Sequence, residues 1–346
     1  MKKYRNRRNN EVNFNDFMIL KKLLRRWLCL FLSVLLVFIC IIGTAEGQVE
    51  EKGWVEQALK AFDVQDYETS LYYFTLLADA GDPYAQYMTA SHYFFSWGTE
   101  QDFGKAAMYA RMSAEQGVPA SQSLLAIMYL DGLGVEQNVA KAVEFSQLAA
   151  DGGDAQAQFL LGWFYDYGIG VDQDFAKAWD YYQLAAEQGN ADAQTNLGAL
   201  YEDGAGVPQS YEEAARYYQM AADQGFAYGQ ARLAQLYEFG DGVEQSNETS
   251  LKYYQLAADQ GDPMGQWGMG KAYQFGVGVD VDYVKAAEYY QLSADQEDPD
   301  GLECLGYLYL EGLGVEQSLE KAIELYELAA ERGSEEAQRQ LLILGR

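Results

Sequence analysis

The chain has 346 residues, and its 52 Asp and Glu against 24 Lys and Arg give a formal net charge of −28. A body this acidic is repelled by phosphate backbones, which argues against nucleic-acid binding. One His and three Cys are few residues from which to build a zinc site or a His-based catalytic centre, so we predict neither a metal site nor a cofactor. The 34 Gly and 28 Tyr beside only 5 Pro require a structural cause.

The N-terminal part has the pattern of an export signal. Residues 1–26 carry nine basic side chains and two acidic ones, a net charge of +7, which leaves −35 for the rest. An apolar run from Trp27 to Ile42 follows, and then the small residues Gly43-Thr44-Ala45. A basic, an apolar and a small-residue segment in this order predict an export signal at 1–45, cleaved after Ala45. The alternative is a retained signal anchor.

The leader predicts where the acidic body is found. A basic flank stays in the cytoplasm, so the body is expected to cross the membrane. We predict an exported protein, either in a bacterial periplasm or secreted; the alternative is an inner-membrane anchor with the repeats outside the cytoplasm. Membrane contact is expected only through the N-terminal segment, if it is not cleaved. Met18 is a second candidate for the true start, because it would give a leader of conventional length.

A period of 36 residues organises the acidic body from Gly81 onward, without insertion or deletion. Its marker is a step such as Ala185-Ala-Glu-Gln-Gly189, which returns as Ala221-Ala-Asp-Gln-Gly225. We number each repeat from that Gly as position 0, so that the repeats begin at residues 81, 117, 153, 189, 225, 261 and 297, with a last half from 333. A fixed period of this size predicts a solenoid.

Each repeat is predicted to contain two helices. Positions 5, 8, 9 and 12 follow the i, i+3, i+4, i+7 spacing of one helical face and hold Gln, an aliphatic residue, Gly or Ala, and Tyr. Gly at positions 15 and 17 then ends the first helix, because a left-handed backbone costs Gly little. The second helix has Ala near position 25, aromatic residues at 28 and 29, and Ala at 33. Most of the Gly and Tyr excess is therefore architectural.

These residues carry a family resemblance. Ala193-Gln194…Leu197-Gly198…Tyr201…Gly204-Ala205-Gly206-Val207, followed by paired Tyr and paired Ala, resembles the Sel-one-like repeat, a relative of the tetratricopeptide repeat. The resemblance covers about residues 81–346. It implies an all-α, right-handed superhelical α/α solenoid of helix-turn-helix repeats with an adaptor or scaffold role. The predicted organisation is the leader at 1–45, a linker at 46–53, a shortened N-terminal capping helix pair at 54–80, seven repeats at 81–332 and a C-terminal capping helix at 333–346.

Two residues depart from the repeat pattern. Glu297 stands at position 0 and Ser96 at position 15, where Gly is usual. If the backbone at Glu297 is left-handed, the substitution should cost about 1 kcal/mol. Some cysteine-rich bacterial relatives have a disulfide in each repeat and bind β-lactams. Neither property is expected here, because the body of this chain keeps only Cys304.

A second stripe on the first helix, at positions 3, 6, 10, 13 and 14, points roughly 140° away from the core stripe. In the tetratricopeptide superfamily the corresponding positions line the concave groove. Here they vary between repeats but are rich in aromatic and acidic residues, which are typical of protein or peptide binding. The alternative is that some of the aromatic residues pack against the neighbouring repeat. The predicted partner-binding residues are Tyr84, Tyr87, Phe94, Phe95, Phe159, Trp163, Asp166, Tyr167, Asp192, Glu202, Asp203, Tyr228, Glu238, Phe239, Trp267, Phe275 and Tyr307.

We therefore predict an exported, non-enzymatic scaffold or adaptor that binds a protein or peptide, and no catalytic residue. His92 occupies position 11, where the other repeats have apolar residues, and is interpreted as a packed helix residue. The negative charge would raise encounter rates with cationic partners, although solubility alone also explains it. Two alternatives remain: a cell-wall hydrolase or β-lactam-binding enzyme of a related repeat family, and a eukaryotic lumenal quality-control adaptor.

Overall fold

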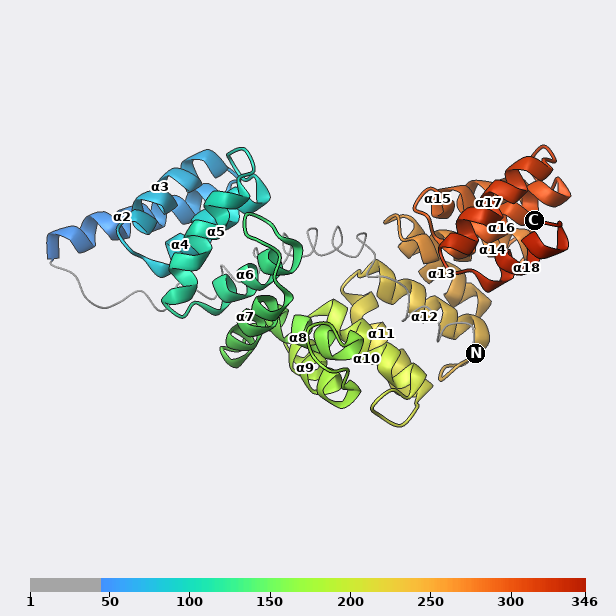
Figure 1. The fold of residues 1–346 in the computed structure, drawn as a ribbon, viewed down its shortest axis with the longest axis horizontal. Helices are drawn as coiled ribbons and strands as arrows, with labels where there is room; N and C mark the ends of the chain where they lie inside the picture. The colour runs from blue at the N-terminus through green and yellow to red at the C-terminus, as the bar shows by residue number, and fades with distance from the viewer. Residues whose placement is uncertain (1–44) are drawn as a thin grey trace. The chain divides into compact units, whose positions relative to one another are not determined.

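The computed structural model describes residues 45–346, and these form helices and no strands (Figure 1). This confirms the all-α prediction. Apart from Ala45, the predicted leader lies outside the described residues. The described helices are α2 (Ala45–Asp63), α3 (Tyr67–Asp79), α4 (Pro83–Phe95), α5 (Phe103–Glu115), α6 (Pro119–Asp131), α7 (Val139–Asp151), α8 (Ala155–Tyr167), α9 (Phe175–Glu187), α10 (Ala191–Asp203), α11 (Tyr211–Asp223), α12 (Ala227–Phe239), α13 (Asn247–Ala258), α14 (Pro263–Phe275), α15 (Tyr283–Ala294), α16 (Pro299–Glu311), α17 (Leu319–Glu331) and α18 (Glu335–Ile343).

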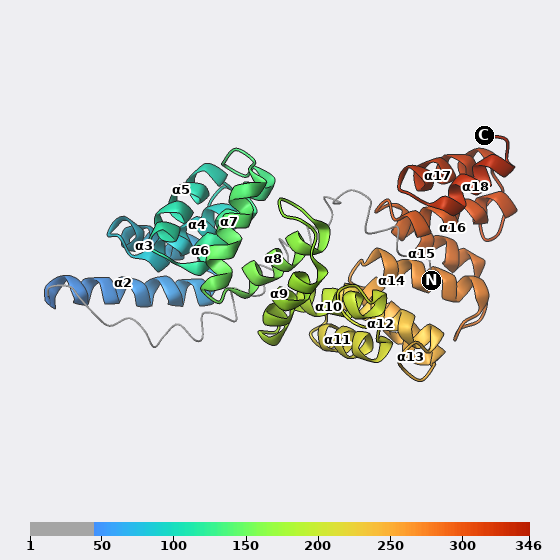
Figure 2. The same ribbon diagram turned by 60° about the horizontal axis from the view of Figure 1, so that its bottom comes forward.

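The chain divides after Gly152 into two compact units, each described by itself. Unit 1 contains α2 to α7 and unit 2 contains α8 to α18. Even-numbered helices from α4 on are the first helices of the repeats, and odd-numbered helices from α5 on are the second. Within unit 2, helix pairs stack in chain order (Figure 2), and α8, α10, α12, α14 and α16 also pack on one another. The first helices therefore form the inner layer of unit 2, and the second helices form its outer layer.

Local signals explain where the helices begin and end. The side chain of Asp154 accepts the Ala157 N–H at 2.8 Å and caps the start of α8. At the end of α10, Gly204 has a φ of 66°, a left-handed conformation that ends the helix. The side chain of Gln209 then donates to the Glu202 carbonyl oxygen at 2.7 Å and satisfies one of the last carbonyls.

Buried Tyr side chains at position 29 fill the space between the helices of unit 2. Tyr182, Tyr218 and Tyr290 have no exposed surface. Each hydroxyl bonds to the side chain at position 13, for example Tyr218 to Glu202 at 2.8 Å. A buried Tyr needs such a partner, because an unpaired hydroxyl would lose its hydrogen bond to water.

Tyr at position 12 stacks on the aromatic ring at position 28. The rings of Tyr201 and Tyr217 lie 5.7 Å apart at an angle of 13°. In several repeats a Lys at position 24 covers the position-12 ring, as Lys177 does at 4.9 Å from the centre of Tyr165. These contacts confirm that much of the Tyr excess is architectural.

The N-terminal helix pair differs from the prediction. Helix α2 has 19 residues, against 13 in most of the other helices, so the pair is not shortened. The predicted linker at 46–53 is helical, because this segment is rich in good helix formers such as Glu, Gln and Lys. At the other end, α18 lies within the predicted capping segment 333–346.

Both departures from the Gly pattern adopt a left-handed backbone. Glu297 has a φ of 60° and Ser96 a φ of 62°.

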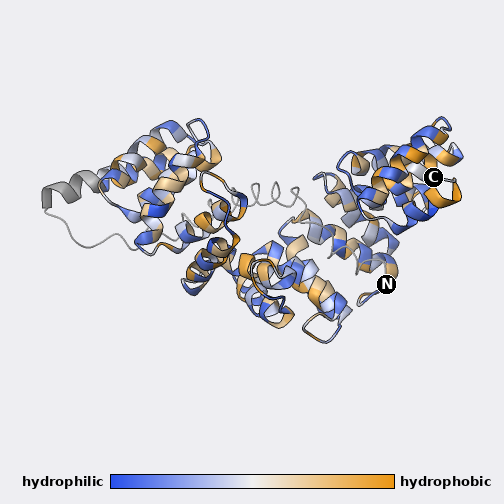
Figure 3. Ribbon diagram, in the orientation of Figure 1, coloured by the Kyte–Doolittle hydropathy of each residue, from blue (hydrophilic) through white to orange (hydrophobic). Residues whose placement is uncertain are grey.

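Hydrophobic and hydrophilic residues alternate on the helices of both units (Figure 3). Of the helices described, none is long and apolar enough to span a bilayer.

Candidate functional site

Six of the predicted aromatic residues are exposed on first helices. In unit 1 this holds for Tyr84 on α4. In unit 2 the exposed fractions lie between 38% and 64%. These five residues are Tyr167 on α8, Tyr228 and Phe239 on α12, Phe275 on α14 and Tyr307 on α16. Their exposure leaves these rings available to a partner.

Three of the predicted partner-binding residues lie in the core, so the prediction is wrong for them. Phe94 and Phe159 are buried, as is Asp166. Phe159 lies 6.0 Å from the ring of Tyr182, which reaches across from the second helix of the same repeat. The Tyr182 hydroxyl donates to Asp166 at 3.3 Å, which explains why position 13 turns inward here. A partner cannot contact these side chains in the folded state.

The remaining aromatic residues of the prediction are partly buried. Trp163 lies 5.6 Å from the ring of Tyr167, so these two rings form one aromatic surface on α8. Trp267 packs against the core cluster of α15 to α18, which includes Leu302 and Leu305. For Trp267 the alternative interpretation, packing against the neighbouring repeat, is therefore the one that holds. Tyr87 and Phe95 in unit 1 are also partly buried.

Glu202 forms a largely buried ion pair between two repeats. Its carboxylate lies 2.6 Å from the guanidinium of Arg232 on the next first helix. The hydroxyl of Tyr218 donates to the same carboxylate at 2.8 Å, and the guanidinium lies 5.5 Å from the centre of the Tyr218 ring. Removing one partner would leave an uncompensated charge, so this pair links the two repeats.

Glu238 repeats the arrangement one repeat further. The carboxylate of Glu238 lies 2.6 Å from the ammonium group of Lys271. The Tyr254 hydroxyl donates to the same carboxylate at 3.0 Å. The ammonium group lies 4.4 Å from the ring centre of Trp267 and 5.3 Å from that of Phe239. A cavity of about 10 Å³ beside the ion pair has room for about one water. Glu202 and Glu238 are thus neutralised by cations of the chain itself.

Of the other acidic residues predicted, Asp203 is exposed and Asp192 partly exposed. The sequence prediction missed Arg232 and Lys271, although a basic residue on a first helix was a usable signal for a charge partner.

His92 is buried, which confirms that it is a packed helix residue. Its Nδ1 lies 2.7 Å from the Met88 carbonyl oxygen. The rings of Phe62, Phe74 and Trp97 surround it at 5.7 to 5.8 Å. Burial lowers the pKa of His92 to about 4, so the ring is neutral at physiological pH. Among residues 45–346, no group of three or more His, Cys, Asp or Glu is placed to hold a metal ion.

Comparison with known families agrees with this architecture. The Sel1 repeat matches residues 63–82, 83–118, 119–154, 155–190, 191–226, 227–262, 263–298 and 305–334. The chain belongs to the Sel1 repeat family. Sel1 repeat proteins are generally non-enzymatic scaffolds for protein interactions.

Two solved structures are similar over most of this chain. One is a protective antigen of uropathogenic Escherichia coli strains with an SLR fold, 32% identical with a TM-score of 0.65, covering 86% of this chain. The match spans 65% of that antigen, less than two thirds of its length. The other is a Sel1 repeat protein from Oxalobacter formigenes, 30% identical with a TM-score of 0.65, covering 70% of this chain and 96% of that one. No match was found among the curated proteins.

Proposed function

We propose that this protein is an exported, non-enzymatic scaffold that binds a protein or peptide through the aromatic residues on the first helices of unit 2. The observation that carries the proposal is the exposure of Tyr228, Phe239, Phe275 and Tyr307. The core of the repeats consists of other positions, so the repeat itself does not require these rings. Exposed aromatic side chains of this kind are frequent hot spots of protein interfaces.

Two further features support the proposal. The first helices form the inner layer of unit 2, which is the side on which superhelical repeats present extended binding surfaces. Asp192 and Asp203 lie on α10, a first helix of the same unit, and their negative charge favours a partner with Lys or Arg near its apolar anchors. Export rests on the basic and apolar leader alone.

Affinity capture with the mature protein as bait tests this function. The variant is Phe239→Ala/Phe275→Ala, because these two rings are the most exposed of the set and their loss should leave the fold intact. We expect the variant to lose the captured partner while its helical circular dichroism stays unchanged. Trp267→Ala is unsuitable, because Trp267 packs in the core.

A matched control changes exposed apolar residues elsewhere. Val284→Gln/Leu319→Gln removes two exposed side chains from second helices of the same unit. This control should retain the partner. Equal capture by the wild type and Phe239→Ala/Phe275→Ala would contradict the proposed function.

A further inference from the structure

Four of the five second helices of unit 2 expose a Leu at position 31, and the fifth has a partly exposed Met there. Leu184, Leu256, Leu292 and Leu328 have exposed fractions between 39% and 49%, and Met220 is partly exposed. A single exposed Leu is ordinary on a protein surface. A regular row is not ordinary: the residue at position 31 recurs on each of the five second helices α9, α11, α13, α15 and α17. We call these five residues the outer aliphatic row.

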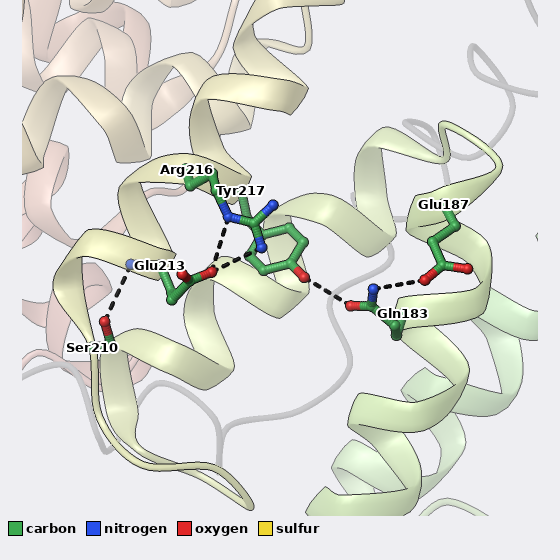
Figure 4. A network of polar contacts seen from close by, with 6 residues as sticks. All are labelled: Gln183, Glu187, Ser210, Glu213, Arg216 and Tyr217. Carbon is green, nitrogen blue, oxygen red and sulfur yellow. Dashed lines mark hydrogen bonds and ion pairs between the residues drawn. The ribbon is translucent and has the colours of Figure 1, made fainter.

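The core of the repeat does not need this row. On α13 the buried side chains include Tyr254 and Ala257, on either side of the exposed Leu256. The neighbouring position 30 has a structural role instead. Gln183 accepts from the Tyr217 hydroxyl at 2.7 Å, which connects α9 to α11 (Figure 4). Equivalent Gln–Tyr hydrogen bonds connect α11 to α13 and α13 to α15, and each of these helices carries one member of the row.

An acidic residue lies one helical turn beyond each member of the row. These residues are Glu187, Asp223, Asp259, Asp295 and Glu331, and all are exposed. Four of them accept a hydrogen bond from the Gln at position 30 of their own helix, at 2.6 to 2.9 Å. No ion pair of the described part of the chain includes any of the five.

The position of these carboxylates is unfavourable for the helices that carry them. Each lies at the C-terminal end of its helix or just after it, where the helix dipole favours a cation. The Lys at position 24 of α9, α15 and α17 does not offset the charge, because it lies in the first turn and covers the ring at position 12. Lys177 pairs with Asp174 at 3.8 Å and covers the ring of Tyr165. Helix stability therefore does not account for the acidic positions.

Unit 1 shows the same face hollowed out. A depression of about 270 Å³ lies on α5, and its lining includes Met112 at position 31 and Glu115 at position 34. Ala107, Met108 and Arg111 of the same helix also line it. The combination of an aliphatic residue and an acidic residue one turn later thus lines a surface recess in unit 1 as well.

We propose that the outer aliphatic row of unit 2 is a second interaction surface, which docks a cationic amphipathic helix of a partner protein. The apolar face of that helix would cover the row, and removing both surfaces from water would supply most of the affinity. Lys or Arg on the flank of the helix would pair with the carboxylates at position 34. The uniform sign of these carboxylates selects a cationic helix and rejects an acidic one.

Fluorescence anisotropy with synthetic peptides tests this surface on the mature protein. The probe is a helix-forming peptide of Leu and Lys with all Leu on one face. One control has the same composition in scrambled order, and the other carries Glu in place of Lys. We expect binding of the probe alone, with affinity that falls as salt is added.

Three variants locate the binding. Leu256→Gln/Leu292→Gln should weaken the probe about tenfold or more. Asp259→Asn/Asp295→Asn should weaken it at low salt and reduce the dependence on salt. Phe239 and Phe275 lie on the inner layer, so Phe239→Ala/Phe275→Ala should bind the probe as the wild type does. Circular dichroism should be the same for all four proteins.

Several results would overturn this proposal. Equal binding of the scrambled peptide would mean unspecific attraction, and no binding of the probe would remove the surface altogether. Loss of binding in Phe239→Ala/Phe275→Ala alone would move the site to the inner layer. A wild-type dimer that Leu256→Gln/Leu292→Gln converts to a monomer in sedimentation would show that a second copy covers the row. Each outcome is independent of the function proposed above, which concerns the other face.

Discussion

Gly270 and Tyr290 fit together because Gly270 has no side chain. A Cβ atom at Gly270 would lie 2.5 Å from Cδ1 of Tyr290, well inside contact distance. Tyr290 is fully buried, and its hydroxyl donates to Gln274 at 2.6 Å, so its ring has no room to move. In the first repeat of unit 1 the same two positions hold Ala90 and Ala110. Of the five repeats with Tyr at position 29, four have Gly at position 9, and the fifth has Ala234 with Tyr254.

Gly270→Ala should therefore destabilise the protein, although Ala favours helix. We expect a loss of about 1 to 3 kcal/mol in the free energy of unfolding, because the added methyl group overpacks the core. Urea denaturation measures it. Gly104→Ala is the control, because Gly104 is an exposed residue of α5 with only the side chain of Asp102 nearby. Equal stability of Gly270→Ala and the wild type would contradict the packing argument.

Glu297→Gly should stabilise the protein by about 1 kcal/mol, because Glu297 has a left-handed backbone that Gly adopts without strain. The ion pair with Arg332 that the substitution removes is exposed and contributes little. Gly261→Glu is the reciprocal test, since Gly261 has a φ of 84° and nothing near its Cβ position. Its loss of stability should be similar in size. A stability change of the same sign in both variants would refute this explanation.

Arg232→Ala should cost about 3 kcal/mol, because it leaves the carboxylate of Glu202 unpaired among buried groups. The double variant Glu202→Gln/Arg232→Met should lose less, since neither charge remains. Arg216→Ala is the control: its pair with Glu213 is exposed and should contribute well under 1 kcal/mol. Thermal and urea unfolding both report these differences. An effect of Arg232→Ala no larger than that of Arg216→Ala would mean that the pair does not link the repeats.

His92 should make stability fall as the pH is lowered from about 6.5 to about 4. The unfolded chain binds a proton near pH 6.5, whereas burial lowers the folded pKa of His92 to about 4, so acid favours the unfolded state in this range. His92→Phe should reduce the slope of stability against pH. The chain has a single His, so its NMR titration can be followed without ambiguity. A folded-state pKa near 6.5 would contradict the burial effect.

Export predicts a defined N-terminus of the mature protein. Cleavage after Ala45 gives a first residue of Glu46, which N-terminal sequencing of the protein from its native compartment determines. Ala45→Phe should block processing, because signal cleavage needs a small residue at this site. Recovery of the wild-type protein with its leader attached to the membrane would instead establish the anchored form.

Local interactions explain what could be predicted. The period of 36, the two helices per repeat and the Gly stops all follow from residues within one repeat. The all-α fold and the packed role of His92 were therefore within reach of the sequence. The helical segment at 46–53 was missed, because the repeat pattern does not extend to it.

The sequence by itself determined that the chain is a solenoid and which face of each first helix varies. Only the tertiary structure decided which side chains on that face a partner can contact. Phe159 is buried by Tyr182, which lies 23 residues away, and Glu202 is paired with Arg232, which lies 30 residues away. Burial and charge pairing depend on such neighbours from other helices, and no helical periodicity contains them. For the same reason, the outer aliphatic row became visible only once the second helices were placed in their layer.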